Sequence, residues 1–286
     1  LIPIEFVILS GMKVSFIEFL NAVPLGWGLL QGQPDNSVEL VLDVPSLCAD
    51  KLARGETDVG LIPVIEYQRI PGLRVLPGIA IASKHEVRSV LFVSRTPIEK
   101  VSRVAVDRAS RTSVALLRIL LEKFYDNPGV EFITTEPEPD MILSELDAAL
   151  VIGNTALKIR KQGLLVYDLA GEWNRFTGLP FVFAFWAFRA GINGKEGAQA
   201  LYESFERGLK SIDEISRVYG DRLNIPAEEV RSYLLTNLDY SLDEPNRRGL
   251  ECFYSYAAQL GLISEVRPLE FLPVESKTGG TRQGIW

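Results

Sequence analysis

One strand–turn–helix segment indicates the fold class of this chain: Val104-Ala-Val-Asp-Arg-Ala-Ser-Arg-Thr-Ser-Val-Ala-Leu-Leu-Arg-Ile-Leu-Leu-Glu-Lys-Phe124. Its pattern predicts a buried strand over Val104–Val106, a polar turn over Asp107–Ser113 and a core-facing helix over Val114–Phe124. The helix begins among three hydroxyl side chains, those of Ser110, Thr112 and Ser113. Unpaired N–H groups and the positive dipole end of a helix attract a carboxylate or phosphate, so this turn is a candidate anion site. Ordinary N-capping by Ser or Thr is the simpler explanation of the same residues when this segment is taken alone.

The composition is that of an ordinary globular protein. The 286 residues are 47% hydrophobic and 23% charged, which suggests about two domains or one large α/β domain. The net charge of −7 argues against nucleic acid or an anionic membrane as partner, because such partners require a basic surface. An anionic small molecule stays compatible, since hydroxyls, amides and one or two arginines bind it locally. No apolar run reaches membrane-spanning length.

Cysteine and histidine are scarce. Cys48 and Cys252 lie far apart in contexts predicted to be helical, which favours two buried thiols over a disulfide and fits a cytoplasmic location. Because His85 is the only histidine and no cysteine pair has ligand spacing, we expect no metal site and no cofactor. The oligomeric state is left open between monomer and homodimer.

The strand-turn-helix rhythm continues on both sides of the opening segment. Strand-like and helix-like segments alternate from Met12 to Asp168, as is typical of a largely parallel sheet with ligand sites at the carboxyl ends of its strands. From Lys195 the pattern becomes helical almost to Ile263, with helices expected over Glu196–Tyr219, Ala227–Leu235 and Glu244–Leu260. Two α/β lobes joined by two crossings, near Ser94–Pro97 and Ala184–Arg189, fit this pattern best. A ligand cleft is then expected between the lobes.

The predicted lobes are discontinuous in the chain. The first comprises residues 12–95 and 188–275, so that the C-terminal helices return to pack on it. The second comprises residues 96–187. Residues 1–11 are interpreted as an upstream extension and residues 276–286 as a tail with little periodicity.

Several catalytic signatures are absent from the sequence. The run Gly26–Gln31 fails the dinucleotide fingerprint at its last glycine, and neither a phosphate-binding P-loop nor a nucleophile elbow occurs. His85 lies on a polar connector, so a histidine-based triad is not expected. Asp58 and Glu66 are candidate carboxylate bases, although Asp58 is expected to cap or pair at the start of its strand.

Small polar side chains stand at the predicted strand ends, where turns converge on one cleft. Hydroxyls, amides and backbone N–H groups of this kind hold an oxygen-rich anion, although each residue also has an ordinary explanation as a cap or turn residue. Arg88, Arg108 or Arg111 would add charge there, but each is expected to be a solvated side chain. The candidate set is Asn21, Ser46, Ser83, Ser89, Ser110, Thr112, Ser113 and Asn154.

A further candidate turn, Gly171–Pro180, precedes the second crossing and contains Trp173, Thr177 and Gly178. Two interpretations of Trp173 stay open at this point: an aromatic residue that packs at the hinge, or a contact to the ligand.

Five motifs in order along the chain resemble the chorismate dehydratases of the futalosine pathway to menaquinone. The resemblance runs in order from about Met12 to Leu262, and together the motifs are far more specific than any one of them alone. They are Phe19-Leu-Asn-Ala-Val-Pro-Leu25, Gly55-Glu-Thr-Asp-Val-Gly-Leu-Ile-Pro-Val-Ile-Glu-Tyr67, Ser110-Arg-Thr-Ser-Val-Ala-Leu-Leu117, Ile152-Gly-Asn-Thr-Ala-Leu157 and Trp173-Asn-Arg-Phe-Thr-Gly-Leu-Pro-Phe-Val-Phe-Ala184.

This resemblance implies a type II periplasmic-binding-protein fold used as a cytoplasmic enzyme. The implied enzyme is a carbon–oxygen lyase that converts chorismate to 3-[(1-carboxyvinyl)oxy]benzoate and water. Catalytic roles fall on Asn21, in the Leu-Asn-Ala-Val-Pro-Leu motif, and on Ser89, before the strand that follows the Ser83–Ser89 connector. The expected substrate contacts are Ser46, Ser83, Ser110, Thr112, Ser113, Asn154, Thr177 and Gly178, with Thr112 and Ser113 as the carboxylate cradle.

Two positions depart from the family pattern. The family motif carries Asp where this chain has Asn154, which matters if that position transfers a proton and not if it only orients substrate, because Asn also accepts and donates hydrogen bonds. The connector also lacks a glycine after Ser83. Since histidine and paired carboxylates are scarce among the candidates, we expect a carboxylate of the substrate to act as the base.

Two other functions stay open at this stage. A non-catalytic binding protein for a small anionic metabolite would have the same cleft, because a fold does not fix a function. The sister enzyme of the futalosine pathway also shares this fold, but a well-placed histidine is expected there and His85 is not in the matching turn.

Overall fold

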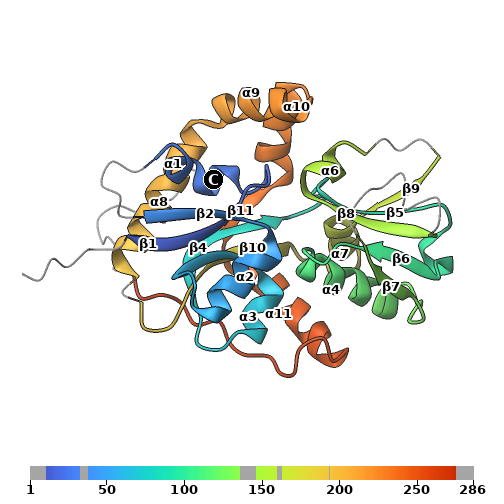
Figure 1. Cartoon of the computed structure of the whole chain (residues 1–286). Helices are drawn as coiled ribbons and strands as arrows, with labels where there is room; N and C mark the ends of the chain where they lie inside the picture. Colours follow the sequence, from blue (N-terminus) through green and yellow to red (C-terminus); the bar gives the residue numbers. More distant parts are fainter. Residues whose placement is uncertain (1–10, 33–37, 136–145, 160–162, 193, 275–286) are drawn as a thin grey trace, which may run out of the picture.

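The computed structural model describes residues 11–32, 38–135, 146–159, 163–192 and 194–274. The predicted extension at residues 1–11, apart from its last residue, and the predicted tail at residues 276–286 lie outside these ranges. Two mixed β-sheets, each flanked by helices, form two lobes that lie side by side (Figure 1). The chain is therefore an α/β protein with two lobes, as the sequence predicts.

The first lobe is built on a sheet with the strand order β11-β4-β10-β3-β1-β2 among the described residues. Strands β1, β2 and β3 are parallel, whereas β10 and β11 run antiparallel to β4, so the sheet is mixed and not largely parallel as predicted. The strands are β1 Met12–Ile17, β2 Val38–Asp43, β3 Val59–Pro63, β4 Arg74–Ser83, β10 Phe181–Phe188 and β11 Asp239–Leu242.

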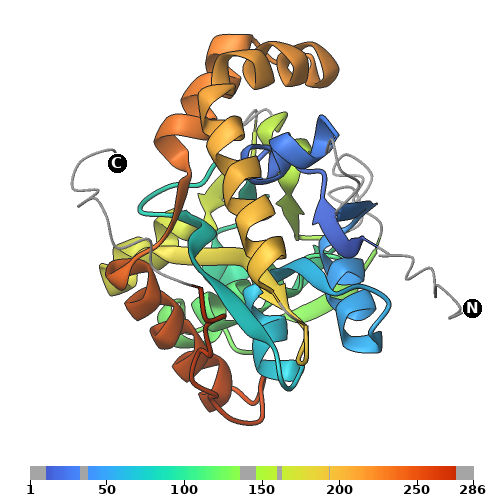
Figure 2. The same cartoon turned by 90° about the vertical axis from the view of Figure 1, so that its left-hand side faces the viewer.

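Helices cover both faces of this sheet. Figure 1 shows α1 above the sheet and α2 and α3 below it, while Figure 2 shows α8 running along the side of α1. The last helix, α11, contacts β10 and also α4 of the second lobe. These helical elements are α1 Val23–Leu30, α2 Pro45–Arg54, α3 Val64–Arg69, α8 Lys195–Lys210, α9 Ile212–Leu223, α10 Ala227–Ser232, the π-helical turn η3 Tyr233–Asn237, and α11 Glu244–Gln259.

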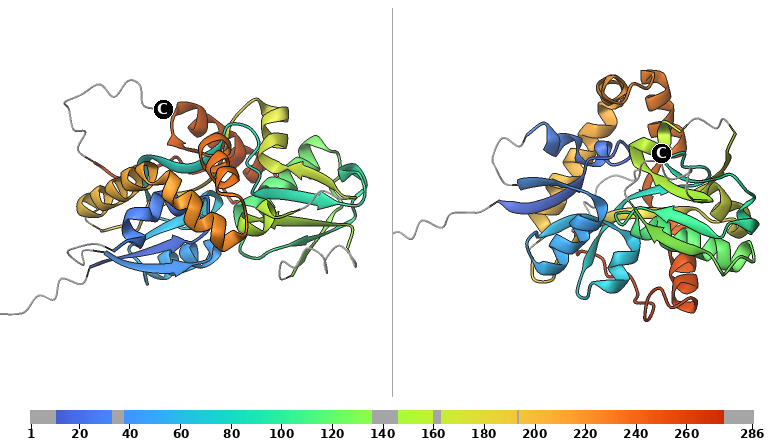
Figure 3. Two further views of the ribbon diagram at one scale, coloured as in Figure 1. Left: turned by 90° about the horizontal axis from the view of Figure 1, so that it is seen from above. Right: turned by 45° about the vertical axis from the view of Figure 1, so that its right-hand side comes forward.

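The second lobe has a sheet with the order β7-β6-β8-β5-β9 among the described residues. Figure 3 shows this sheet beside the first lobe from two further directions. Its strands are β5 Val90–Ser94, β6 Arg103–Val106, β7 Glu131–Thr134, β8 Ala148–Ile152 and β9 Leu165–Asp168. Its helical elements are η1 Ile98–Lys100, α4 Arg111–Ile119, the π-helical turn η2 Leu120–Phe124, α6 Gly153–Leu157 and α7 Leu169–Thr177.

The chain crosses between the lobes earlier than the sequence predicts. Strand β5 pairs with β8 and β9, so it lies wholly in the second sheet, and β10 pairs with β3 and β4, so it lies wholly in the first. The crossings therefore fall at residues 84–89 and 178–180, instead of near Ser94–Pro97 and Ala184–Arg189. Both strands are buried along their whole length. A strand buried on both faces loses its polar–apolar alternation, so its sequence does not reveal which sheet it joins.

The sequence does not predict strand β11. It lies between the helices expected over Ala227–Leu235 and Glu244–Leu260 and pairs antiparallel with β4 at the edge of the first sheet. Its alternating burial is that of an edge strand, but four residues are too few to stand out between two helices. Helix α11 then begins at an Asp243 cap, whose carboxylate accepts a hydrogen bond from the Asn246 N–H.

Two smaller predictions concern cysteines and membrane spans. Both cysteines are free thiols, with Cys48 buried and Cys252 half-buried, so the predicted absence of a disulfide between them is confirmed. Burial raises the pKa of the Cys48 thiol to about 12. Among the described helices, none has the length and apolarity needed to span a bilayer.

Candidate functional site

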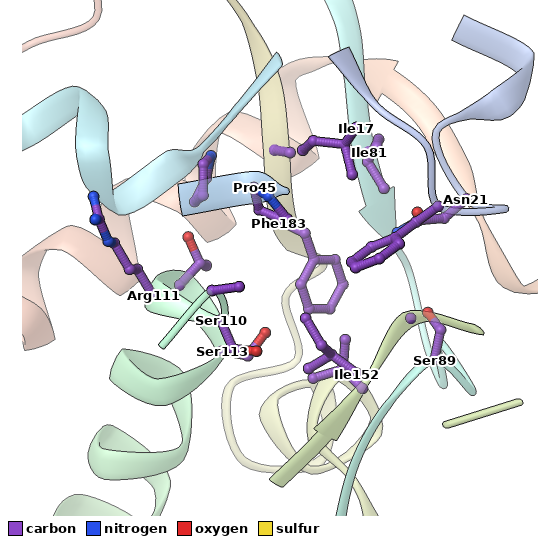
Figure 4. Close-up of a pocket in the computed structure, with 17 residues that line it drawn as sticks. Ile17, Asn21, Pro45, Ile81, Ser89, Ser110, Arg111, Ser113, Ile152 and Phe183 are labelled. Atoms are coloured by element: carbon purple, nitrogen blue, oxygen red, sulfur yellow. The ribbon is translucent and has the colours of Figure 1, made fainter. Parts of the chain in front are cut away.

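A pocket lies between the two lobes, with about 530 Å³ of empty volume that is partly open to solvent. Figure 4 shows Asn21 and Ser89 on one side of it and Ser110, Arg111 and Ser113 on the other. We call the first pair the reaction wall, and we call Ser110, Thr112 and Ser113 the anchoring wall. Apolar side chains from both lobes line the space between them, chiefly Ile17, Phe19, Ile81, Ile152 and Phe183.

The reaction wall joins two segments that meet at the ends of β1 and of the first crossing. Asn21 follows β1 in the turn that leads into α1, and its Oδ1 is buried without a hydrogen-bond partner. Ser89 closes the first crossing, directly before β5, and is fully buried. Its Oγ also has no hydrogen bond of acceptable geometry. Both polar atoms therefore lack a partner within the part of the chain that the structure describes.

Tyr233 lies near Ser89. Burial raises the pKa of the Tyr233 phenol, and the adjacent Ser89 hydroxyl offsets part of that rise. The phenol is therefore neutral near pH 7. Despite this proximity, Ser89 Oγ has no partner that meets the distance and angle of a hydrogen bond.

The anchoring wall is the N-terminus of α4. Ser110 occupies the N-cap position, but its side chain makes no capping hydrogen bond, and its Oγ is buried and unpaired. The simple capping interpretation of this turn therefore does not hold for Ser110. The first N–H groups of α4 have no acceptor within the helix, so the wall presents donors and a positive dipole end to the pocket.

Thr112 connects the anchoring wall to the first lobe. Its Oγ1 accepts a hydrogen bond of 3.3 Å from the backbone N–H of Ile65, at the start of α3. The hydroxyl proton of Thr112 stays available to a ligand, because the oxygen is the acceptor in this bond. Ser113 lines the pocket beside it.

Arg111 is the only charged side chain among the described residues that line the pocket. Its guanidinium makes a two-pronged ion pair with Asp50, at 2.8 and 2.9 Å, and a third contact of 3.0 Å with Glu66. Glu66 also pairs with Arg69 at 2.7 Å. The hydrogen bond to Asp50 raises the pKa of Arg111. Arg111 is thus a cross-lobe ion pair and not the solvated side chain that the sequence predicts, and its charge is balanced within the protein.

The predicted site residues separate into two groups. Asn21, Ser89, Ser110, Thr112 and Ser113 line the pocket. The other five are outside its lining: Ser46, Ser83, Asn154, Thr177 and Gly178.

Most residues of the second group have local partners. Ser83 Oγ bonds to the backbone of His85 within the crossing. Thr177 Oγ1 donates to the carbonyl of Trp173 at 2.7 Å and accepts from the Leu179 N–H, which closes the end of α7. Gly178 takes the left-handed conformation that ends this helix, with φ of +69°.

Asn154 Oδ1 accepts a hydrogen bond of 3.0 Å from the Leu20 N–H. Ser46 lies in the first turn of α2.

Three further candidates are accounted for by structure. Trp173 is fully buried and donates to the Pro180 carbonyl at 3.1 Å, so it packs at the second crossing as one of the two interpretations predicted. His85 lies outside the pocket lining, with its ring 3.4 Å from the Asn174 side-chain oxygen. Asp58 pairs with Arg189 at 3.2 Å, as expected for a residue that caps or pairs.

Sequence reasoning missed the apolar part of the pocket. Phe19 and Gly153 face each other from opposite lobes, and a Cβ on Gly153 would lie 3.1 Å from the Phe19 ring. Gly153 has a φ of +63°, which favours glycine, so both its conformation and this close approach depend on the missing side chain. Both residues stand within the quoted motifs, and this was the only signal that marked them.

Comparisons with known proteins agree on both fold and family. A structure of a protein from Archaeoglobus fulgidus superposes with a TM-score of 0.71 at 21% identity, covering 89% of this chain and 99% of that one. The aliphatic sulphonate binding protein SsuA from Escherichia coli superposes with a TM-score of 0.61 at 14% identity, covering 96% and 98%. These likenesses show a periplasmic-binding-protein-like fold.

The sequence relatives are enzymes. The chain is 32% identical over 238 residues to a chorismate dehydratase of Thermus thermophilus, covering 77% of this chain and 85% of that protein. It is 25% identical over 253 residues to a chorismate dehydratase of Campylobacter jejuni, covering 86% and 97%. A family model described as menaquinone biosynthesis matches residues 12–259. The chain therefore belongs to the menaquinone biosynthesis family.

Proposed function

We propose that this protein is a chorismate dehydratase, a carbon–oxygen lyase that forms 3-[(1-carboxyvinyl)oxy]benzoate and water. Family membership and the two similar chorismate dehydratases support this activity. One feature of the site carries the proposal: the oxygen atoms Asn21 Oδ1, Ser89 Oγ and Ser110 Oγ are buried without partners around one pocket. A buried polar atom without a partner costs about 1–3 kcal/mol, so three around one pocket indicate a ligand rich in hydrogen-bonding groups.

The shape and polarity of the pocket suit this substrate. Chorismate has an apolar ring edge, a hydroxyl and two carboxylates. In the proposed complex the ring lies between the apolar side chains of Phe19 and Phe183, and one carboxylate lies at the anchoring wall. Because Arg111 is already paired with Asp50 and Glu66, the carboxylate is held mainly by hydroxyls, backbone N–H groups and the helix dipole.

The reaction removes a ring proton and the hydroxyl on the neighbouring carbon, which leave together as water, and the ring becomes aromatic. Asn21 and Ser89 orient the ring substituents in this proposal, with the Ser89 hydroxyl donating to the departing oxygen. A donor placed where negative charge develops lowers the barrier without reorganisation. Correct positioning of the reacting groups supplies about 7–11 kcal/mol in the best intramolecular reactions.

The base in this proposal is a carboxylate of the substrate. Among the described residues that line the pocket there is no Asp, Glu, His, Cys, Lys or Tyr. The pocket is lined instead by hydroxyls and one amide, which are too weakly basic to remove the ring proton near pH 7. A hydroxyl would first have to lose its own proton to a partner. Glu66, a candidate base from the sequence, is held by Arg69 and Arg111 instead.

The proposal is tested by mixing the purified protein with chorismate, without added cofactor, and following the aromatic enol ether by ultraviolet absorbance and chromatography. We expect conversion to a single product whose mass is lower by one water. Chorismate binding, measured by calorimetry, without any product would favour a non-catalytic binding protein. Conversion of a futalosine-derived nucleoside in place of chorismate would favour the sister enzyme.

A further inference from the structure

The segment Gly153–Asn154 connects the two halves of the reaction wall. The Gly153 N–H donates to the backbone carbonyl of Ser89 at 2.8 Å. One residue later, Asn154 Oδ1 accepts from the Leu20 N–H at 3.0 Å, across the cleft. Leu20 directly precedes Asn21. Two successive residues at the start of α6 are therefore bonded to the backbone of Ser89 and to the backbone of Leu20, the residue before Asn21.

The Leu20 N–H depends on this contact. Leu20 is buried at 1% exposure, and the turn around it uses the carbonyls of Phe19 and Leu20 to accept from Ala22 and Val23. Among the described residues, the Leu20 N–H donates only to Asn154 Oδ1. Without Asn154 this donor is buried and unsatisfied, and the turn that presents Asn21 loses its fixed point on the second lobe.

The close approach of Gly153 to Phe19 makes the contact geometrically possible. Any side chain at position 153 would press on the Phe19 ring at 3.1 Å and hold α6 away from the turn. The glycine and the asparagine therefore act as one unit, the first by allowing the approach and the second by bonding across it.

We infer that Asn154 is a positioning residue that fixes Asn21 relative to Ser89 through its hydrogen bond to Leu20. Its side chain does not line the pocket, so it acts through Leu20 and not on the substrate. The function needs an acceptor oxygen at this place and no proton transfer. An aspartate at position 154 supplies the same acceptor, so either residue serves. This inference rests on the proposed dehydratase activity.

The test compares four variants by steady-state kinetics with chorismate. Asn154→Leu and Asn154→Ala remove the acceptor, and the second also favours the helix, so that one of the two remains usable if the larger side chain disturbs folding. Asn154→Asp keeps the acceptor. Thr155→Val changes an exposed neighbour on the same helix and serves as the matched control. Amide hydrogen exchange of Leu20, measured without substrate, reports on the hydrogen bond independently of activity.

We expect Asn154→Leu and Asn154→Ala to lower kcat by about 10- to 100-fold and to keep KM within about threefold. A misplaced Asn21 side chain loses more of its interaction with the transition state than of its interaction with the bound substrate. Asn154→Asp and Thr155→Val are expected to keep kcat within about threefold. Exchange at Leu20 accelerates only in the variants without the acceptor.

Three kinetic results would overturn the inference: an unchanged kcat in both acceptor-free variants, a rise in KM alone, or an Asn154→Asp protein as slow as Asn154→Leu. Unchanged exchange at Leu20 would do the same. Failure of the wild-type protein to convert chorismate would contradict the proposed function instead, and the exchange measurement separates the two.

Discussion

The two walls of the pocket are built in different ways. The anchoring wall is fastened to the first lobe by side-chain contacts: Thr112 accepts from the Ile65 N–H, and Arg111, which lies between Ser110 and Thr112 in the chain, is bound to Asp50 and Glu66. The reaction wall is held through the backbone: the Gly153 N–H donates to the Ser89 carbonyl, and the N–H of Leu20, the residue before Asn21, donates to Asn154 Oδ1. The side chains of Asn21 and Ser89 themselves are left without partners, and in the anchoring wall the Ser110 hydroxyl is also buried without one.

This difference separates two roles. Groups that are already bonded within the protein cannot strengthen their interactions much as the reaction proceeds, so they contribute mainly to binding. Groups that are buried, unpaired and held by their backbone are preorganised for charge that develops in the transition state. Thr112 and Arg111 are therefore expected to affect mainly KM, and Asn21 and Ser89 mainly kcat, and substitutions of these residues test that division.

The largest effect is expected from Asn21→Ala. Loss of the carboxamide removes a preorganised polar group at the reacting ring, so kcat should fall by about 10²- to 10³-fold while chorismate still binds. The melting temperature should not fall, because the lost Oδ1 has no partner in the free protein. Steady-state kinetics and thermal unfolding measure both quantities. Asn174→Ala, which changes an amide on α7 outside the pocket lining, is the control, and a near-normal rate for Asn21→Ala would remove this residue from the mechanism.

The next effect concerns two buried serines at opposite ends of the first crossing. Ser89→Ala should lower kcat by about 10- to 100-fold without loss of stability, since its hydroxyl is unpaired in the free protein. Ser83→Ala removes a hydroxyl that bonds to the His85 backbone, so it should lower the free energy of unfolding by about 1 kcal/mol and leave kcat unchanged. Denaturant titration and kinetics distinguish the two. The reverse pattern would show that Ser83, and not Ser89, serves the reaction.

The fold was predictable where local signals and burial agree. Helix α2 has a proline in its first turn and ends at Gly55, whose φ is +72°, as capping rules predict. The crossings were misplaced because β5 and β10 are apolar on both faces, so their sequence carries no trace of their partners. Strand membership depends on tertiary pairing, which local sequence does not encode.

The site was predictable only in part for a similar reason. Asn21, Ser89 and the α4 turn stand at strand and crossing ends, where chain position alone brings them to the cleft. Thr177 resembles them in sequence, yet its hydroxyl closes the end of α7. Arg111 shows the opposite case, because its two carboxylate partners lie 61 and 45 residues away along the chain and leave no local sign.

A moderate effect is expected from Arg111→Met. The change leaves Asp50 without its two-pronged partner and removes one of two partners of Glu66, so the free energy of unfolding should fall by about 1–3 kcal/mol. The α4 N-terminus then loses its tether to the first lobe, and KM should rise about tenfold with a smaller change in kcat. Arg108→Met changes an exposed arginine of the same turn and is the control. If kcat falls as far as in Ser89→Ala, the division between the walls fails.

The smallest effect is expected from Thr112→Val. Valine keeps the volume but loses the acceptor for the Ile65 N–H and the donor for a substrate carboxylate, so KM should rise about fivefold for a bond of about 1 kcal/mol. Thr112→Ser keeps the hydroxyl and should keep KM, which separates loss of the hydrogen bond from loss of the methyl group. Since Thr112 is already bonded within the protein, kcat should change least here. A lower kcat with unchanged KM would place the chemistry at the anchoring wall and reverse the assignment of the two walls.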